Sequence, residues 1–138
     1  MSDWVMGCLH TSAIYLYETG RVQWIFRQRT KALSLEIIRI VSGLKYSDAL
    51  NVICKQLFKS VTSVAANFRA VCRSRSDKER YSKLCIVVEE ADETLFWIEM
   101  LIDGGFIAVA KIEICKKEAE EILKVMAAFK KKLERIHQ

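Results

Sequence analysis

Two charged sets of side chains have the types and spacing to do chemistry in this 138-residue chain. The first set is acidic and follows the run EEADE with one further glutamate: Glu89, Glu90, Asp92, Glu93 and Glu99. Carboxylates at this density can in principle hold a divalent metal ion. At helical spacing they more often form a solvated face or ion pairs between helices. We therefore expect no metal site.

The second set is basic, lies on one face of an expected helix and continues past a short hinge. Its members are Lys55, Lys59, Arg69, Arg73, Arg75, Lys78, Arg80 and Lys83. Basic side chains repeated along one face can neutralise phosphates, with an affinity that falls as salt rises. No stacking aromatic side chain is interleaved with the part of this set on the second helical segment, so contacts to an RNA or DNA backbone are expected rather than contacts to bases. The alternatives are a solvated face and, for Arg69, an ion pair with the acidic set.

Residue patterns typical of enzymes and cofactor sites are missing. Only His10 and His137 are histidines, and the E-x-x-H spacing occurs once, from Glu134 to His137. The second E-x-x-H motif that a di-iron bundle needs is missing, and so is a glycine-rich phosphate loop. The cysteines are odd in number and contain no C-x-x-C pair: Cys8, Cys54, Cys72, Cys85 and Cys115. Such cysteines are expected to pack in the core of a protein in the reducing cytoplasm. We expect a protein that is not an enzyme and has no cofactor.

Apolar residues recur at steps of three and four along four segments, which is the helical period. The segments are about Trp24–Ser42, Ser47–Arg73, Asp77–Asp103 and Lys111 to the C-terminus. Proline is absent, and the five glycines lie between the periodic segments or near the N-terminus. Long helices with short connections pack as antiparallel neighbours. The sequence therefore predicts an all-α fold, an antiparallel up-down-up-down four-helix bundle.

The expected boundaries follow from local chemistry. Gly43 is expected to end the first helix in a left-handed conformation, and Ser76 with Glu79 fits a capping box at the start of the third. We predict a bundle domain over residues 23–138 and a poorly ordered or loosely packed tail over residues 1–22. The apolar run in the tail is too short for a membrane span, and no membrane partner is expected.

A stripe of small residues lies beside the apolar face of the second segment: Ser60, Ser63, Ala66, Asn67, Ala70 and Ser74. Small side chains let a neighbouring helix approach closely, so the stripe should face the third segment or another subunit. Asn67 within the stripe is expected to be buried, and a buried amide needs a hydrogen-bond partner. We predict a structural hydrogen bond between Asn67 and Glu93.

Several of these motifs occur together, in order, in a known family. The stretches are KQL at 55–57, SVTSVAANFR at 60–69, KL at 83–84 and EEADET at 89–94, followed by Trp97. They resemble the four-helix-bundle proteins of the 23S rRNA intervening-sequence family, also called S23-type proteins, over about Phe26 to Leu133. Ala65 stands where the family usually has glycine, which does not threaten the fold.

The resemblance implies a four-helix bundle that associates as a homo-oligomer, with a pentamer favoured. It extends to the accessory variability protein of diversity-generating retroelements. We carry two functions forward. The first is an oligomeric RNA-binding module that acts through the basic face. The second is an interaction bundle that recruits a protein partner, similar to the retroelement accessory proteins.

Overall fold

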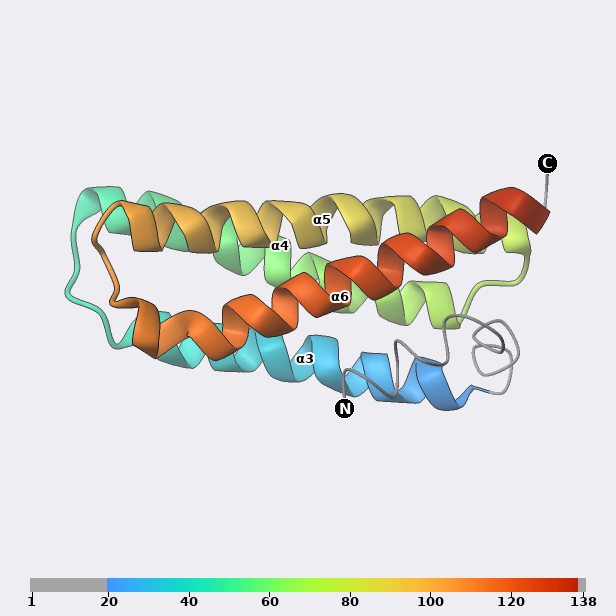
Figure 1. Cartoon of the computed structure of the whole chain (residues 1–138), viewed down its shortest axis with the longest axis horizontal. Helices are drawn as coiled ribbons and strands as arrows, with labels where there is room; N and C mark the ends of the chain where they lie inside the picture. Colours follow the sequence, from blue (N-terminus) through green and yellow to red (C-terminus); the bar gives the residue numbers. More distant parts are fainter. Residues whose placement is uncertain (1–19, 137–138) are drawn as a thin grey trace.

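The computed structural model describes residues 20–136, and every structural statement below refers to that part of the chain. It contains four helices: α3 (Arg21–Ser42), α4 (Asp48–Cys72), α5 (Asp77–Asp103) and α6 (Val109–Ile136). Consecutive helices run in opposite directions, and α3 and α6 lie side by side (Figure 1). The predicted all-α four-helix bundle is confirmed. Most of the predicted tail falls outside the described residues, and α3 already begins at Arg21.

The core forms where the apolar stripes of the four helices meet. Phe26 of α3 is fully buried, and its ring meets those of Phe68 in α4 and Phe129 in α6 edge to face, at centroid distances of 6.4 and 6.3 Å. Edge-to-face aromatic pairs add to the free energy gained by burial. The predicted period of three and four residues therefore places the core correctly.

Serine side chains cap two of the helices. The Ser47 hydroxyl accepts a hydrogen bond from the backbone N–H of Leu50, and the Ser76 hydroxyl accepts one from that of Glu79, both at 3.1 Å. The Glu79 carboxylate in turn accepts from the backbone N–H of Arg75 at 3.2 Å. The capping box is present, with its return bond one residue earlier than in the standard pattern.

The prediction for Gly43 is wrong in its conformation. Gly43 does follow the last residue of α3, but its φ is −85°, in the right-handed region. The helix ends because the Gly43 N–H donates to the Ile40 carbonyl at 3.3 Å, a tighter last turn that needs no positive φ. The left-handed glycines of the described chain are Gly20, before α3, with φ of 77°, and Gly105, after α5, with φ of 74°.

Two buried hydroxyl contacts fix the heights of three helices relative to one another. The Ser34 hydroxyl of α3 donates to the Val61 carbonyl of α4 at 2.9 Å. The Thr94 hydroxyl of α5 lies 3.1 Å from that of Ser60 in α4, and both residues are almost fully buried. The small-residue stripe of α4 therefore faces α5 at Ser60. This helix is one of the two neighbours predicted for the stripe, the other being a second subunit.

An ion-pair network joins α3 to α6. The Arg29 guanidinium bonds to Glu118 and lies 2.9 Å from a Glu121 carboxylate oxygen. It also sits 4.8 Å from the centre of the Phe26 ring. Burial alone would lower the pKa of Arg29, but the bonds and charges of the two glutamates outweigh it and raise the pKa above its ordinary value.

Candidate nucleic-acid interface

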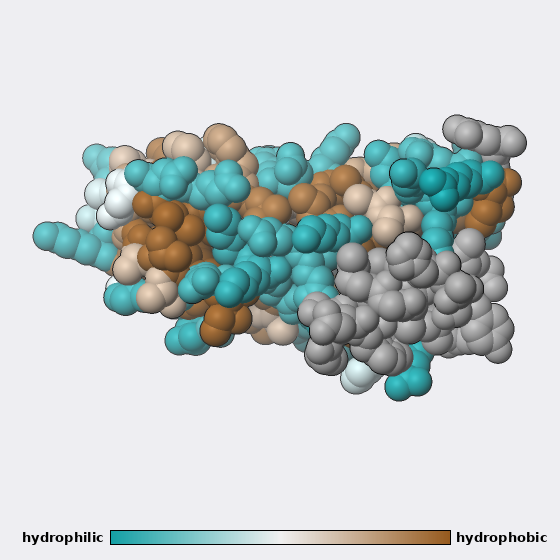
Figure 2. Space-filling model, viewed as in Figure 1, coloured by the Kyte–Doolittle hydropathy of each residue, from teal (hydrophilic) through white to brown (hydrophobic). Residues whose placement is uncertain are grey.

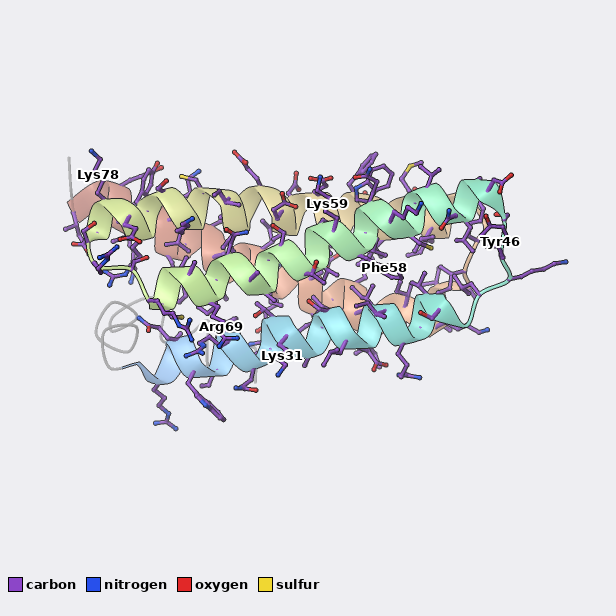
Figure 3. The ribbon with its side chains drawn as sticks, turned by 180° about the vertical axis from the view of Figure 1, so that it is seen from behind. Lys31, Tyr46, Phe58, Lys59, Arg69 and Lys78 are labelled. Atoms are coloured by element: carbon purple, nitrogen blue, oxygen red, sulfur yellow. The ribbon has the colours of Figure 1, made fainter. Side chains whose placement is uncertain are left out.

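The predicted basic set of α4 does not form one continuous face. Figure 3 shows Lys59 on the side of α4 next to α5 and Arg69 on the side next to α3. Burial and then the neighbouring Glu93 raise the pKa of Glu90, while the positive charge of Lys59 partly opposes them. The charge of Lys59 therefore acts on an α5 carboxylate, without forming an ion pair with it in the described chain. Lys55, also exposed, lies in the half of α4 away from the hinge.

The remaining predicted residues gather around the hinge, residues 73–76. Arg73, Arg75 and Lys78 are all exposed there. Arg80 is less available to bind a phosphate, because its guanidinium forms an ion pair with Asp77 one turn earlier. Lys83 is half-buried on α5. The hinge therefore presents three exposed cations from the predicted set.

Positive charge is concentrated in the half of the bundle that contains the hinge, when each helix is divided at its midpoint. The hinge half comprises residues 20–31, 60–90 and 123–136, because α3 begins and α6 ends at the hinge end (Figure 1). It holds 15 Lys and Arg against five Asp and Glu, whereas the far half holds seven against ten. Antiparallel pairing creates this end-to-end polarity, so it cannot be seen in the order of charges along the chain.

A groove of about 520 Å³ runs between α3 and α4. Three cationic side chains line it near the hinge end: Arg27, Lys31 and Arg69. Farther along, Leu35 and Ile38 line it on the α3 side, with alanines 65 and 66 on the α4 side. Figure 3 shows Lys31 and Arg69 next to each other across this α3–α4 groove. Arg69 makes no ion pair with an α5 carboxylate in the described chain, so that alternative is not realised.

Sequence reasoning missed Arg27 and Lys31 as companions of Arg69. They are four residues apart on α3, which places them on one face of that helix. Their proximity to Arg69 cannot be seen from nearby positions in the sequence, because it depends on how α3 packs against α4.

The cysteines of the described residues lie in or beside the core. Cys54 and Cys115 are buried, and Cys72 is half-buried. Burial raises the pKa of the Cys72 thiol, and the nearby charges of Arg27 and Arg80 oppose that rise only in part. The thiol form, which is a poor nucleophile, is therefore favoured. Cys8 lies outside the described residues.

The predicted bond between Asn67 and Glu93 is replaced by other partners. The Asn67 amide donates to the carbonyl and the hydroxyl of Ser63 on its own helix, both at 2.9 Å. Glu93 accepts from the Trp97 indole N–H at 3.2 Å, again within one helix. Asn67 is half-buried rather than buried. Hydrated amide and carboxylate groups gain little from a bond across the helices, and the buried polar contact is made by Ser60 and Thr94 instead.

The acidic set of α5 presents no metal centre in residues 20–136. No group of three or more His, Cys, Asp or Glu residues there is arranged to hold a metal ion. Within the same range, no helix combines the length and apolar character needed to cross a membrane.

Comparison with known proteins agrees with this architecture. Residues 23–128 match the family model of the 23S rRNA-intervening sequence protein. The chain belongs to this family. Similar folding is seen in the crystal structure of a protein of unknown function from the S23 ribosomal protein family of Bacteroides thetaiotaomicron. That structure is 27% identical, covers 79% of this chain and 97% of its own, and has a TM-score of 0.72. No curated protein matches the chain.

Family membership thus confirms the resemblance read from the motifs. The matched range begins inside the first turn of α3 and ends within α6, so all four helices of the bundle are part of it. The hinge and the α3–α4 groove both lie inside the matched range.

Proposed function

We propose that this family member is a non-enzymatic module that binds RNA through the phosphate backbone, with the hinge end as the contact surface. The observation that carries the proposal is the charge polarity of the bundle, with 15 basic and five acidic residues in the hinge half. Phosphate neutralisation supplies most of the affinity of such binding and does not depend on base sequence. We expect a dissociation constant of about 1 μM or weaker for one subunit.

We further propose that the protein acts as a homo-oligomer, with a pentamer favoured by the family resemblance. Repetition of a weak site raises the overall affinity for a long polyanion without any new contact. Exposed apolar side chains support self-association: Trp24, Leu35, Phe96 and Met100 are exposed to 63%, 59%, 50% and 40%. These side chains lie on the helices rather than in the hinge, so association would leave the hinge open.

The test is a titration of the full chain with a structured RNA at low and high salt. Replacing Arg73, Arg75 and Lys78 with glutamine should weaken binding at least tenfold at low salt. It should also flatten the slope of log affinity against log salt by about two, since each lost phosphate contact removes somewhat less than one unit. The matched control replaces Lys45, Lys111 and Lys116 in the far half with glutamine.

The control changes net charge by the same amount, so it separates a contact surface from a general effect of charge. The proposal requires the hinge variant to lose clearly more affinity than the control while both keep the helical content and mass of the parent. Equal losses in the two variants, or no binding by the parent at low salt, would contradict it.

A second candidate function is the recruitment of a protein partner. It is favoured by apolar side chains at the far end of the bundle, where Val109 and Ile114 at the start of α6 are exposed to 51% and 83%. Figure 2 shows apolar surface gathered at this end. Intact protein that fails to bind RNA at low salt would leave this candidate as the remaining function.

A further inference from the structure

Two surfaces of the bundle have no partner in the described chain and carry opposite charge. The first is the α3–α4 groove, whose cations Arg27, Lys31 and Arg69 form no ion pair with any described residue. The second is a ridge on α5, defined by four exposed side chains at steps of three and four residues: Glu89, Asp92, Phe96 and Met100. Residues so spaced lie on one face of a helix. Neither carboxylate of this α5 ridge is ion-paired within residues 20–136.

The order of side chains along the two surfaces matches. On α3 the sequence runs from the cations Arg27 and Lys31 to the apolar Leu35 and Ile38. On α5 it runs from two carboxylates to Phe96 and Met100. Both helices run from the hinge end to the far end (Figure 1). An α5 ridge laid parallel to α3 therefore places carboxylates against cations and apolar side chains against apolar side chains.

The register of this match fits two copies that stand at nearly equal height. Within one copy, Ser34 is level with Val61, and Ser60 is level with Thr94, so α3 residues are level with α5 residues about 59 positions later. Pairing Arg27 with Glu89, or Leu35 with Phe96, requires an offset of 62 or 61 positions. The offset between copies exceeds the offset within one copy by two or three residues. This is an axial shift of at most about 5 Å, which is less than one helical turn.

We propose that the α5 ridge of a second copy of this chain occupies the α3–α4 groove, parallel to α3. The inference rests on the self-association proposed above and assigns its surfaces. Because the groove and the ridge are different surfaces, the contact is head-to-tail, and each copy can accept one neighbour and donate to another. Such a series forms a closed ring where the rotation between copies closes and the small offset is taken up at the contacts. All hinge ends then point to the same side of the ring.

The test uses charge reversal, read out by light scattering on the full chain at fixed protein concentration and low salt. Replacing Lys31 and Arg69 with glutamate should dissociate the assembly, with the assembly constant falling at least tenfold. Replacing Glu89 and Asp92 with lysine should do the same from the other side. Combining all four replacements places two acidic side chains in the groove opposite two basic ones on the ridge, with Arg27 unchanged, and should recover most of the assembly that either pair of replacements loses.

The matched control reverses Lys45 and Lys111, two exposed lysines outside both surfaces, and should keep the parent mass. If the parent is monomeric, both this inference and the proposed self-association fail, while RNA binding by single copies is unaffected. If the parent is an oligomer but the Lys31 and Arg69 reversal keeps its mass, the assigned surfaces are wrong and self-association stands. Loss of RNA binding at unchanged mass would instead show the groove to be a phosphate site.

The combined variant gives the most specific outcome. Each pair of reversals could weaken assembly by a general change in charge, but the four replacements together leave net charge as it is in the parent. Failure of the combined variant to reassemble, although it is folded by circular dichroism, would overturn the pairing of groove with ridge.

Discussion

Replacement of Arg29 with methionine tests how much the network between α3 and α6 stabilises the bundle. The Arg29 side chain is 11% exposed, and its partners Glu118 and Glu121 are 29% and 20% exposed. Removing one partner of a fully buried pair costs about 3–5 kcal/mol, because a charge is left without compensation. Water still reaches both carboxylates here, so we expect a loss of about 3 kcal/mol, including the contact with the Phe26 ring.

That loss corresponds to a fall of about 10 °C in Tm, because a chain of this length has an unfolding entropy of about 0.3 kcal/mol/K. Denaturant unfolding followed by circular dichroism, at one protein concentration, measures it directly. Arg39 provides the control, since its pair with Glu36 lies on the surface with side chains 70% and 45% exposed. Its replacement with methionine should cost far less than that of Arg29, because solvent screens the surface pair.

A rescue variant separates the unpaired charges from other effects of the substitution. Adding Glu118→Gln and Glu121→Leu to Arg29→Met removes the two carboxylates and should recover at least half of the lost stability. The reasoning is refuted if Arg29→Met costs no more than Arg39→Met, or if the rescue variant is less stable than Arg29→Met alone.

Two further predictions concern α4 and α5. Thr94→Val removes the buried contact with Ser60 and should cost about 1 kcal/mol of folding stability. Asn67→Ala loses only hydrogen bonds to Ser63 in its own helix and should cost less than half as much. Equal losses of stability in denaturant unfolding would contradict this prediction. Burial raises the pKa of Glu90, so its ionisation opposes folding at neutral pH. Glu90→Gln should therefore stabilise at pH 7, with a gain that disappears as pH falls below about 4.5; a gain that persists there would contradict it.

The helices could be predicted from the sequence because their determinants are local. A repeated step of three and four apolar residues marks the face to be buried, and Ser76 with Glu79 marks a start by a bond between neighbours. The expected ends were accurate to within a few residues. α3 begins at Arg21 rather than near Trp24, because the apolar period extends one turn further back than predicted, to the buried Val22 four residues before Phe26.

The candidate site was less predictable because it depends on contacts between helices. Lys59 and Arg69 share a broad face of α4, yet one faces α5 and the other faces α3 (Figure 3). The same limit explains Asn67, which lies seven residues after Ser60. A straight helix turns about 20° per seven residues relative to an exact heptad repeat. That rotation, with the longer side chain, separates a buried hydroxyl from a half-hydrated amide.

The uneven charge of the two ends gives the bundle a large permanent dipole along its long axis, roughly 40 Å from end to end. A polyanion exerts a torque on such a molecule before any contact is made, turning the hinge end towards it. At physiological ionic strength this guidance acts only within about 8 Å of the surface. The polarity therefore governs the orientation of productive encounters, and dilution of salt should increase the association rate more than it lengthens the lifetime of the complex.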